Sequence, residues 1–191
     1  MARIRGRLPD YLVPGLSILF VGINPGLRSS EVGHHFAGPS NRFWKLLFES
    51  GLTPYQMTCR DDGLLLDYGY GFTNLVAKPT RGLHNLSRQD CLRGRRALVA
   101  KITKFQPTLV ALLGISVART MFPLVLSTTS KKRLASDPVQ TGLQSELLEG
   151  IPVFVLPNPS GRNAHYSYQK MGDIFRELKA VSLQLSGAIR R

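Results

Sequence analysis

The stretch SILFVGINPGLRSSEVGHHFAGPSNRFW, residues 17–44, determines how the rest of the chain can be interpreted. A short apolar run ends in glycine, as a buried strand does, and the turn Gly-Ile-Asn-Pro-Gly follows it directly. A polar loop punctuated by glycine then leads to a helix, with Pro39 near its first turn and Ser40 as a cap. The stretch therefore predicts a strand, a turn and a helix start in close succession.

The charge of the chain indicates a polyanionic partner. Its 191 residues include 25 Lys and Arg against 12 Asp and Glu, a net charge of +13. The segment 78–104 has a single acid, Asp90, among the basic residues Lys78, Arg81, Arg88, Arg93, Arg95, Arg96, Lys101 and Lys104. Such a balance in a small domain is typical of nucleic-acid binding. The alternative is a basic protein without that role, whose charges cover a solvated helix face.

Nothing in the chain predicts a membrane or secreted protein. No apolar run approaches the roughly 18 to 20 residues of a membrane span, and the basic lead-in at 1–15 continues into the turn without a cleavage site. Cys59 and Cys91 lack the spacing of a disulfide framework or a metal site. We therefore expect a single domain over residues 1–191, monomeric, cytoplasmic and nucleoid-associated, which needs no metal and no cofactor.

Strand and helix signals alternate along the chain. Apolar runs predict strands at 17–22, 72–76, 108–113 and 151–156. Periodic patterns predict helices at 40–50, 87–104, 115–122 and 167–185. Other segments lack a pattern, namely a loosely held lead-in at 1–15, an irregular region at 52–71 and a mobile loop at 127–144. The order predicts an α/β fold, a three-layer α/β/α sandwich around a mostly parallel sheet of four to five strands.

Three local signals add detail to this outline. Ser87 with Asp90 three residues later forms a capping box at the start of a helix, and Glu149-Gly150 turns a small hairpin into the last strand. The turns at 22–26 and 157–161 follow the carboxyl ends of two strands. Ligands of open α/β sheets bind at those ends, so we expect both turns to face one cleft.

The first turn has the chemistry of a fixed amide. It contains neither GxGxxG nor Gly-Lys-Ser/Thr, which disfavours a nucleotide cofactor. Pro25 restricts the backbone of Asn24, so the amide carbonyl of Asn24 can orient a water molecule. The alternative is that Asn24 only satisfies the backbone of its own turn.

Four motifs in order carry a family resemblance: GINPG at 22–26, GHHFAGPSNRFW at 33–44, GFTN at 71–74 and NPSGRNA at 158–164. Together they resemble the mismatch-specific uracil/thymine-DNA glycosylases of the uracil-DNA glycosylase superfamily, over about residues 18–178. The resemblance implies an enzyme that flips a base out of mismatched or damaged double-stranded DNA and hydrolyses its N-glycosidic bond, leaving an abasic site.

The resemblance also implies roles for residues of the first half. Asn24 would position the attacking water, and Phe36 would stack on the flipped base. The backbone N–H groups of Ile23 and Gly26 would stabilise the negative charge on the leaving base, together with the Asn158 side chain. Asn74 would pair with the pyrimidine edge, and Ser29 would set the space near its 5-position. These signals conflict. Ser29 resembles the residue of the uracil-active branch at this position, whereas Asn74 and the His34-His35 pair resemble those of the thymine-active branch.

The second half supplies the contacts to the duplex in this resemblance. Arg162 would enter the space that the base vacates and contact the orphaned guanine, whereas Ser160, Gly161 and Asn163 would lie against the DNA backbone. We interpret the two histidines as structural or DNA-facing, because the motif holds no carboxylate to tune them. Neither turn contains lysine, which predicts a monofunctional hydrolase without lyase chemistry.

We expect uracil opposite guanine to be the main substrate and thymine a weaker one. Asparagine replaces the Asp and His of stronger relatives at Asn24 and Asn158, so we expect a modest catalyst. Two alternatives stay open. The first is a glycosylase for another lesion, such as a deaminated purine or an oxidised cytosine. The second is a non-catalytic nucleic-acid-binding domain that kept the cleft.

Overall fold

The computed structural model describes residues 6–122 and 139–189. One five-stranded sheet runs in the order β2-β1-β3-β5-β4. Its strands are β1 Ile18–Gly22, β2 Tyr70–Asn74, β3 Val110–Leu113, β4 Gly142–Leu143 and β5 Val153–Leu156. All neighbouring pairs are parallel except β4 with β5. The predicted α/β fold with a mostly parallel central sheet is therefore confirmed.

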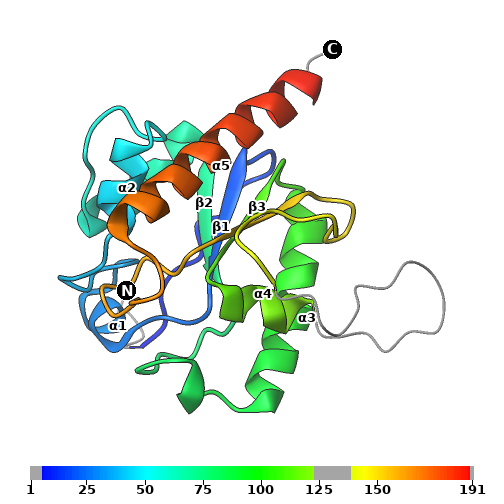
Figure 1. Ribbon diagram of the computed structural model, residues 1–191. Helices are drawn as coiled ribbons and strands as arrows, with labels where there is room; N and C mark the ends of the chain where they lie inside the picture. The colour runs from blue at the N-terminus through cyan, green and yellow to red at the C-terminus, as the bar shows by residue number, and fades with distance from the viewer. Residues whose placement is uncertain (1–5, 123–138, 190–191) are drawn as a thin grey trace.

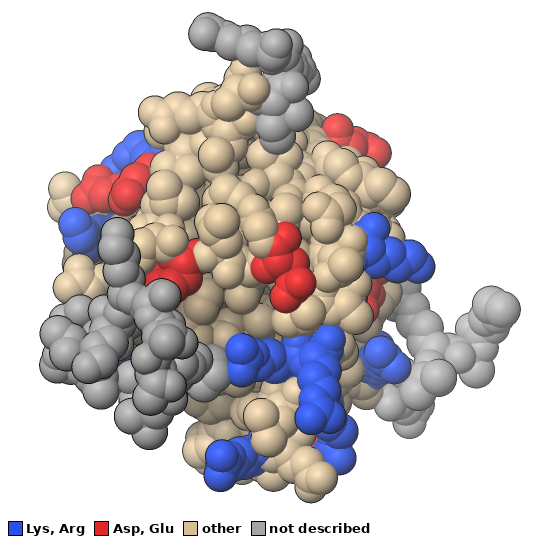
Figure 2. Space-filling view, turned by 90° about the vertical axis from the view of Figure 1, so that its right-hand side faces the viewer, with Lys and Arg blue, Asp and Glu red and all other residues tan. Residues whose placement is uncertain are grey.

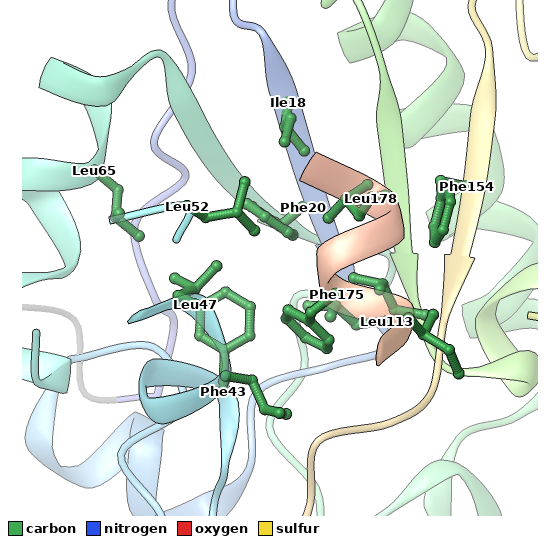
Figure 3. Close-up of a cluster of buried hydrophobic side chains, with 14 of the residues drawn as sticks. Ile18, Phe20, Phe43, Leu47, Leu52, Leu65, Leu113, Phe154, Phe175 and Leu178 are labelled. Carbon is green, nitrogen blue, oxygen red and sulfur yellow. The ribbon is translucent and has the colours of Figure 1, made fainter. Parts of the chain in front are cut away.

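The strands of the sheet centre are apolar because helices cover both faces. Every residue of β1, β3 and β5 is buried, as expected for parallel strands between two helical layers. Side chains alternate between the faces, so Ile18 and Phe20 belong to one core cluster while Leu19 and Val21 belong to the other. Figure 3 shows the first cluster, with Phe43 and Phe175 packed from the helices toward Phe20.

The helices divide between the two faces of the sheet (Figure 1). α2 Phe43–Glu49 and α5 Tyr168–Ile189 contribute to the cluster around Phe20, whereas α3 Arg88–Phe105 and α4 Ile115–Met121 contribute to the cluster around Val21. α3 begins at the predicted capping box, in which Ser87 and Asp90 bind each other's backbone N–H groups. The two residues of this capping box lie three positions apart, which explains why the start of α3 could be predicted from the sequence.

The segment between β1 and β2 differs from its prediction in three places. A short helix, α1 Leu27–Val32, occupies part of the predicted polar loop. α2 begins at Phe43 rather than near Ser40, because Asn41 Oδ1 accepts the hydrogen bond of the Phe43 N–H. A 3-10 helix, η1 Cys59–Tyr68, runs through the region predicted as irregular. These elements are short and polar, so they carry little periodic signal.

The edges of the sheet also differ from the sequence patterns. β2 begins at Tyr70, two residues before its predicted start, since pairing with β1 sets its register. Of the predicted mobile loop, residues 127–138 lie outside the described residues. Its last part contains β4, which pairs with β5. The prediction of a loop at Gly142 and Leu143 is therefore wrong. The predicted hairpin is confirmed, because Leu148 pairs with Ile151 across Glu149 and Gly150.

Within the predicted loose lead-in, residues 8–11 are held in place by burial and by backbone hydrogen bonds. Leu8 is buried, and Tyr11 exchanges two backbone hydrogen bonds with Phe72 of β2, at 2.9 and 3.0 Å.

A further short 3-10 helix, η2 Leu83–Asn85, precedes α3. Within the described part of the chain, no helix has the length and apolar character that crossing a membrane requires.

Candidate functional site

A cleft of about 570 Å³ opens at the carboxyl ends of the parallel strands, a size usual for ligand sites. Both proline-containing turns face it, as predicted. The lining includes most of the predicted site residues, namely Ile23, Asn24, Gly26, Ser29, Phe36, Asn74, Asn158, Ser160 and Arg162. Gly161 and Asn163 are not part of that lining, and both instead support the second turn.

The Asn24 side chain is fixed through its amide nitrogen. Nδ2 donates to Pro25 O at 2.9 Å, to Lys78 O at 3.3 Å and to Thr80 Oγ1 at 2.9 Å. Two of these acceptors are backbone carbonyls, which cannot donate, so the amide nitrogen must face them. The carbonyl oxygen Oδ1 therefore points the other way, and no described group donates to it. An amide held like this offers a free acceptor to a water molecule in the cleft.

Thr80 is a site residue that the sequence patterns did not identify. Its hydroxyl donates to Gly82 O at 2.8 Å, which leaves the oxygen as an acceptor for Asn24. Its backbone N–H donates to Pro25 O at 3.1 Å and so ties this segment to the first turn. The residue follows β2 in a turn-rich segment without periodicity, and only the pairing of β1 with β2 brings it beside Asn24.

Phe36 presents a half-buried aromatic ring to the cleft. It stacks on Phe43 with ring centroids 4.2 Å apart and an interplanar angle of 24°. Its backbone is left-handed, with φ 53°, a conformation that is uncommon for a bulky residue and persists only where its surroundings enforce it. Ser29 contributes to that enforcement, since its buried Oγ accepts the Ala37 N–H at 3.0 Å.

The two histidines do have a carboxylate partner, contrary to the inference from the motif alone. Asp62 of η1 lies 2% exposed. Its Oδ1 is 3.1 Å from His34 Nδ1, and its Oδ2 accepts the His35 N–H at 2.9 Å. His35 Nε2 contacts Pro9 O at 2.8 Å, and burial lowers the pKa of its ring. His35 Nε2 is the donor in that contact, because a carbonyl oxygen cannot donate, and the structural role of the two histidines stays a prediction.

Asn74 lies at the end of β2, directly beside Gly22 of β1. A Cβ atom at Gly22 would come within 2.7 Å of Asn74 Oδ1, so a side chain at this position would displace the end of the Asn74 side chain. No hydrogen bond of the Asn74 side chain occurs within the described residues. The amide therefore keeps both its donor and its acceptor for a ligand in the cleft.

The second turn organises itself through its own polar groups. Asn158 Oδ1 accepts the Ser160 N–H at 3.0 Å, and Asn163 Nδ2 donates to Asn158 O at 2.9 Å. Asn163 thus closes the turn rather than lining the cleft. The Asn158 amide nitrogen donates to none of the described residues, so it is available to an anion in the cleft.

The two halves of the cleft are joined directly. The Arg42 N–H donates to Pro159 O at 2.9 Å. Gly161 packs so closely on Ser40 that an added Cβ would lie 2.5 Å from the Ser40 carbonyl oxygen. Arg162 is exposed and reaches across the cleft, where its Nη2 lies 3.4 Å from Arg81 O. The expected meeting of the two motif regions therefore takes place.

The basic segment begins at the cleft, which Arg81 lines, and continues along α3 toward the opposite end of the sheet. Figure 2 shows Lys and Arg side chains gathered in the lower half of this face, the end toward which the parallel strands run in Figure 1. Lys78, Arg81, Arg88, Arg96 and Lys104 are among the exposed ones. Two members of the predicted set have protein partners: Arg93 pairs with Asp90 at 2.7 Å, and Lys101 with Asp10 at 2.7 Å.

A family comparison decides the assignment of the fold. The model of the uracil DNA glycosylase superfamily matches residues 9–179. The chain belongs to this superfamily. A solution structure from Methanosarcina acetivorans, of a protein provisionally assigned as a uracil DNA glycosylase, is similar with a TM-score of 0.57 and 18% identity. The match covers 95% of this chain and 98% of that one, and it supports the superfamily fold.

The superfamily comparison leaves the metal question to the residues themselves. Among residues 6–122 and 139–189, no three His, Cys, Asp or Glu side chains come together in a way that could hold a metal ion. The expectation that the protein needs no metal or cofactor stays a prediction.

Proposed function

We propose that this chain is a monofunctional DNA N-glycosylase that removes uracil from mismatched duplex DNA, with a preference for uracil opposite guanine. The observation that carries the proposal is the arrangement of three groups around one cleft. The Asn24 carbonyl oxygen lies on one side, the Phe36 ring forms a stacking surface, and Arg162 stands at the mouth. Superfamily membership supports the same reaction class.

The proposed reaction uses water as the nucleophile. Asn24 Oδ1 accepts a hydrogen bond from the water and directs its oxygen toward C1′ of the sugar. The C1′–N bond breaks and its electron pair leaves with the base. The water oxygen bonds to C1′ and becomes the hydroxyl of the abasic site, while the second proton of the water passes to solvent or to the departed base. The cleft holds an amide here in place of a carboxylate, so the water is only weakly activated. The rate therefore depends mainly on how easily the base leaves, which favours bases that stabilise a negative charge.

Stabilisation of the leaving base is assigned to the two turns. The Asn158 amide nitrogen is free to donate, and the backbone N–H groups of Ile23 and Gly26 belong to the cleft lining. Hydrogen-bond donors held in place before the reaction stabilise developing negative charge at little reorganisation cost. Asn74, with a free donor and a free acceptor, matches the edge of a pyrimidine.

The choice between uracil and thymine rests on Ser29. Ser29 is 7% exposed, and its hydroxyl accepts the Ala37 N–H, so the side chain cannot move aside without releasing the loop before α2. We propose that this fixed side chain limits the space for a 5-methyl group. Uracil is therefore the main substrate, and thymine is excised more slowly.

The test is a panel of labelled duplexes, each with one modified base opposite guanine or adenine. After incubation, alkali cleaves abasic sites and the products are sized on a gel. Wild-type protein is expected to cut at uracil opposite guanine, and Asn24→Ala to bind the same duplex while losing about a hundredfold or more of the rate, the usual effect of removing a positioned group. Cleavage only at a deaminated purine or an oxidised cytosine would replace the substrate. Binding without cleavage at any base would exclude the enzyme.

A further inference from the structure

Residues 8–11 form an extended segment along the outer edge of β2. Tyr11 and Phe72 exchange two backbone hydrogen bonds in an antiparallel bridge. Asp10 adds side-chain contacts, since its Oδ1 accepts the Thr73 hydroxyl at 2.6 Å and its Oδ2 pairs with Lys101 at 2.7 Å. β2 is an end strand of the sheet, so this segment covers an edge that would otherwise have unpaired backbone groups.

The inner side of the same segment reaches the candidate site. Leu8 is 7% exposed and lines the cleft. Pro9 O accepts the hydrogen bond of His35 Nε2 at 2.8 Å. Tyr11 donates its hydroxyl hydrogen to Asp62 Oδ1 at 2.9 Å. Leu8 therefore contacts the cleft, Pro9 contacts the loop that precedes Phe36, and Tyr11 is linked to that loop through Asp62.

Asp62 connects this segment to the stacking surface. One carboxylate oxygen accepts from Tyr11 and lies 3.1 Å from His34 Nδ1, while the other accepts the backbone N–H of His35 at 2.9 Å. The carboxylate is buried, where hydrogen bonds to it are strong and costly to lose. It thus binds the two residues immediately before Phe36, whose left-handed backbone needs such enforcement.

We propose that residues 8–11 and Asp62 act together as a clasp that holds Phe36 against the cleft, which makes Asp62 and Tyr11 positioning residues for base stacking. The clasp rests on the proposed function for the role of Phe36. Its physical basis is that the Phe36 ring packs on Phe43 and Phe72 while its backbone is left-handed, so the position of the ring depends on how the loop at 34–36 is held.

The test compares Asp62→Asn and Tyr11→Phe with the wild-type protein. Asparagine has one acceptor oxygen in place of two, so it cannot accept from His35 and Tyr11 through separate oxygens as the carboxylate does. Tyr11→Phe removes a single hydroxyl. The control is Tyr70→Phe on β2, whose half-buried hydroxyl has no hydrogen bond among the described residues.

Two readouts are measured at a temperature well below unfolding. The first is amide hydrogen exchange at 34–37, expected to speed up by about tenfold in Asp62→Asn, as for a local opening. The second is the single-turnover excision rate from a uracil duplex, expected to fall by about tenfold to a hundredfold, as for a misplaced binding group. Duplex Kd stays within about threefold, Tyr11→Phe has a smaller effect in the same direction, and Tyr70→Phe has none.

The outcomes separate the clasp from the proposed function. If wild-type protein excises no base, the proposed function fails, and hydrogen exchange at 34–37 still decides the clasp. Unchanged exchange in both variants would overturn the clasp. Faster exchange with an unchanged excision rate would show that the contacts of Asp62 and Tyr11 only stabilise the loop, and it would overturn their positioning role. If Asp62→Asn does not fold, Tyr11→Phe decides the question by the same two measurements.

Discussion

Replacing Thr80 with valine removes the hydroxyl that orients Asn24, together with the two contacts of that hydroxyl to Gly82. Valine keeps nearly the shape of threonine but cannot accept the hydrogen bond of Asn24 Nδ2, which is 2.9 Å long. Two acceptors remain, Pro25 O at 2.9 Å and Lys78 O at 3.3 Å, so the amide is held less firmly without being released. Serine at the same position keeps the hydroxyl and is the matched control.

The expected effect on the rate follows from the one hydrogen bond that the Asn24 amide loses. A hydrogen bond between neutral groups contributes about 1 kcal/mol net, and the Asn24 side chain is only partly buried, which keeps the loss near that value. Each 1.36 kcal/mol is tenfold in rate, so we expect the Thr80→Val excision rate to fall about fivefold to tenfold. Thr80→Ser is expected to stay within about twofold of wild type.

The assay is single-turnover excision from a duplex with one uracil opposite guanine, with binding of the duplex measured in parallel. If Thr80 acts through Asn24, Thr80→Val lowers the rate in the wild-type background and has no further effect in the Asn24→Ala background. Equal losses in both backgrounds would show that Thr80 acts independently of Asn24. A Thr80→Val rate equal to that of wild type would refute the orientation argument.

Three further predictions concern the cleft and the basic face. Arg162→Ala is expected to reduce the preference for guanine as the opposite base, measured as the ratio of excision rates in paired duplexes; an unchanged ratio would contradict its contact with the orphaned base. Gly22→Ala is expected to displace Asn74, whose Oδ1 lies 2.7 Å from the added Cβ, and to lower excision about tenfold or more with little change in duplex affinity. Hydrogen bonds from Ser87 and Arg93 lower the pKa of Asp90 from 3.8 to about 2. The resulting stabilisation is present above the unfolded value and disappears as pH falls through the folded one. Asp90→Asn should therefore flatten the dependence of unfolding free energy on pH between about 4 and 2, and an unchanged slope would contradict the assignment.

Much of the fold could be predicted from the sequence because its signals are local. β1 and β3 are continuous apolar runs between helices, and α3 starts at a capping box whose two members, Ser87 and Asp90, lie three residues apart. Elements without such a signal were missed or displaced. η1 is a polar 3-10 helix, and the start of β2 depends on its pairing with β1.

The candidate site divides in the same way. Motif order in the sequence was enough to propose Asn24, Phe36 and Arg162. The position of both turns after the carboxyl ends of predicted strands was enough to predict that they face one cleft. The residues that hold these groups could not be predicted. Thr80 contacts Asn24 across 56 positions of chain, and Asp62 contacts Tyr11 across 51.

The sequence alone therefore determined many of the chemical groups that line the cleft, and the tertiary structure added Thr80 and decided how the side chains are oriented. Patterns of hydrophobicity and capping act over a few residues, so they can be read along the chain. The free oxygen of Asn24 exists only because three acceptors occupy its nitrogen. Those acceptors meet the turn through the parallel pairing of β1 with β2, a contact between distant segments that no local pattern encodes.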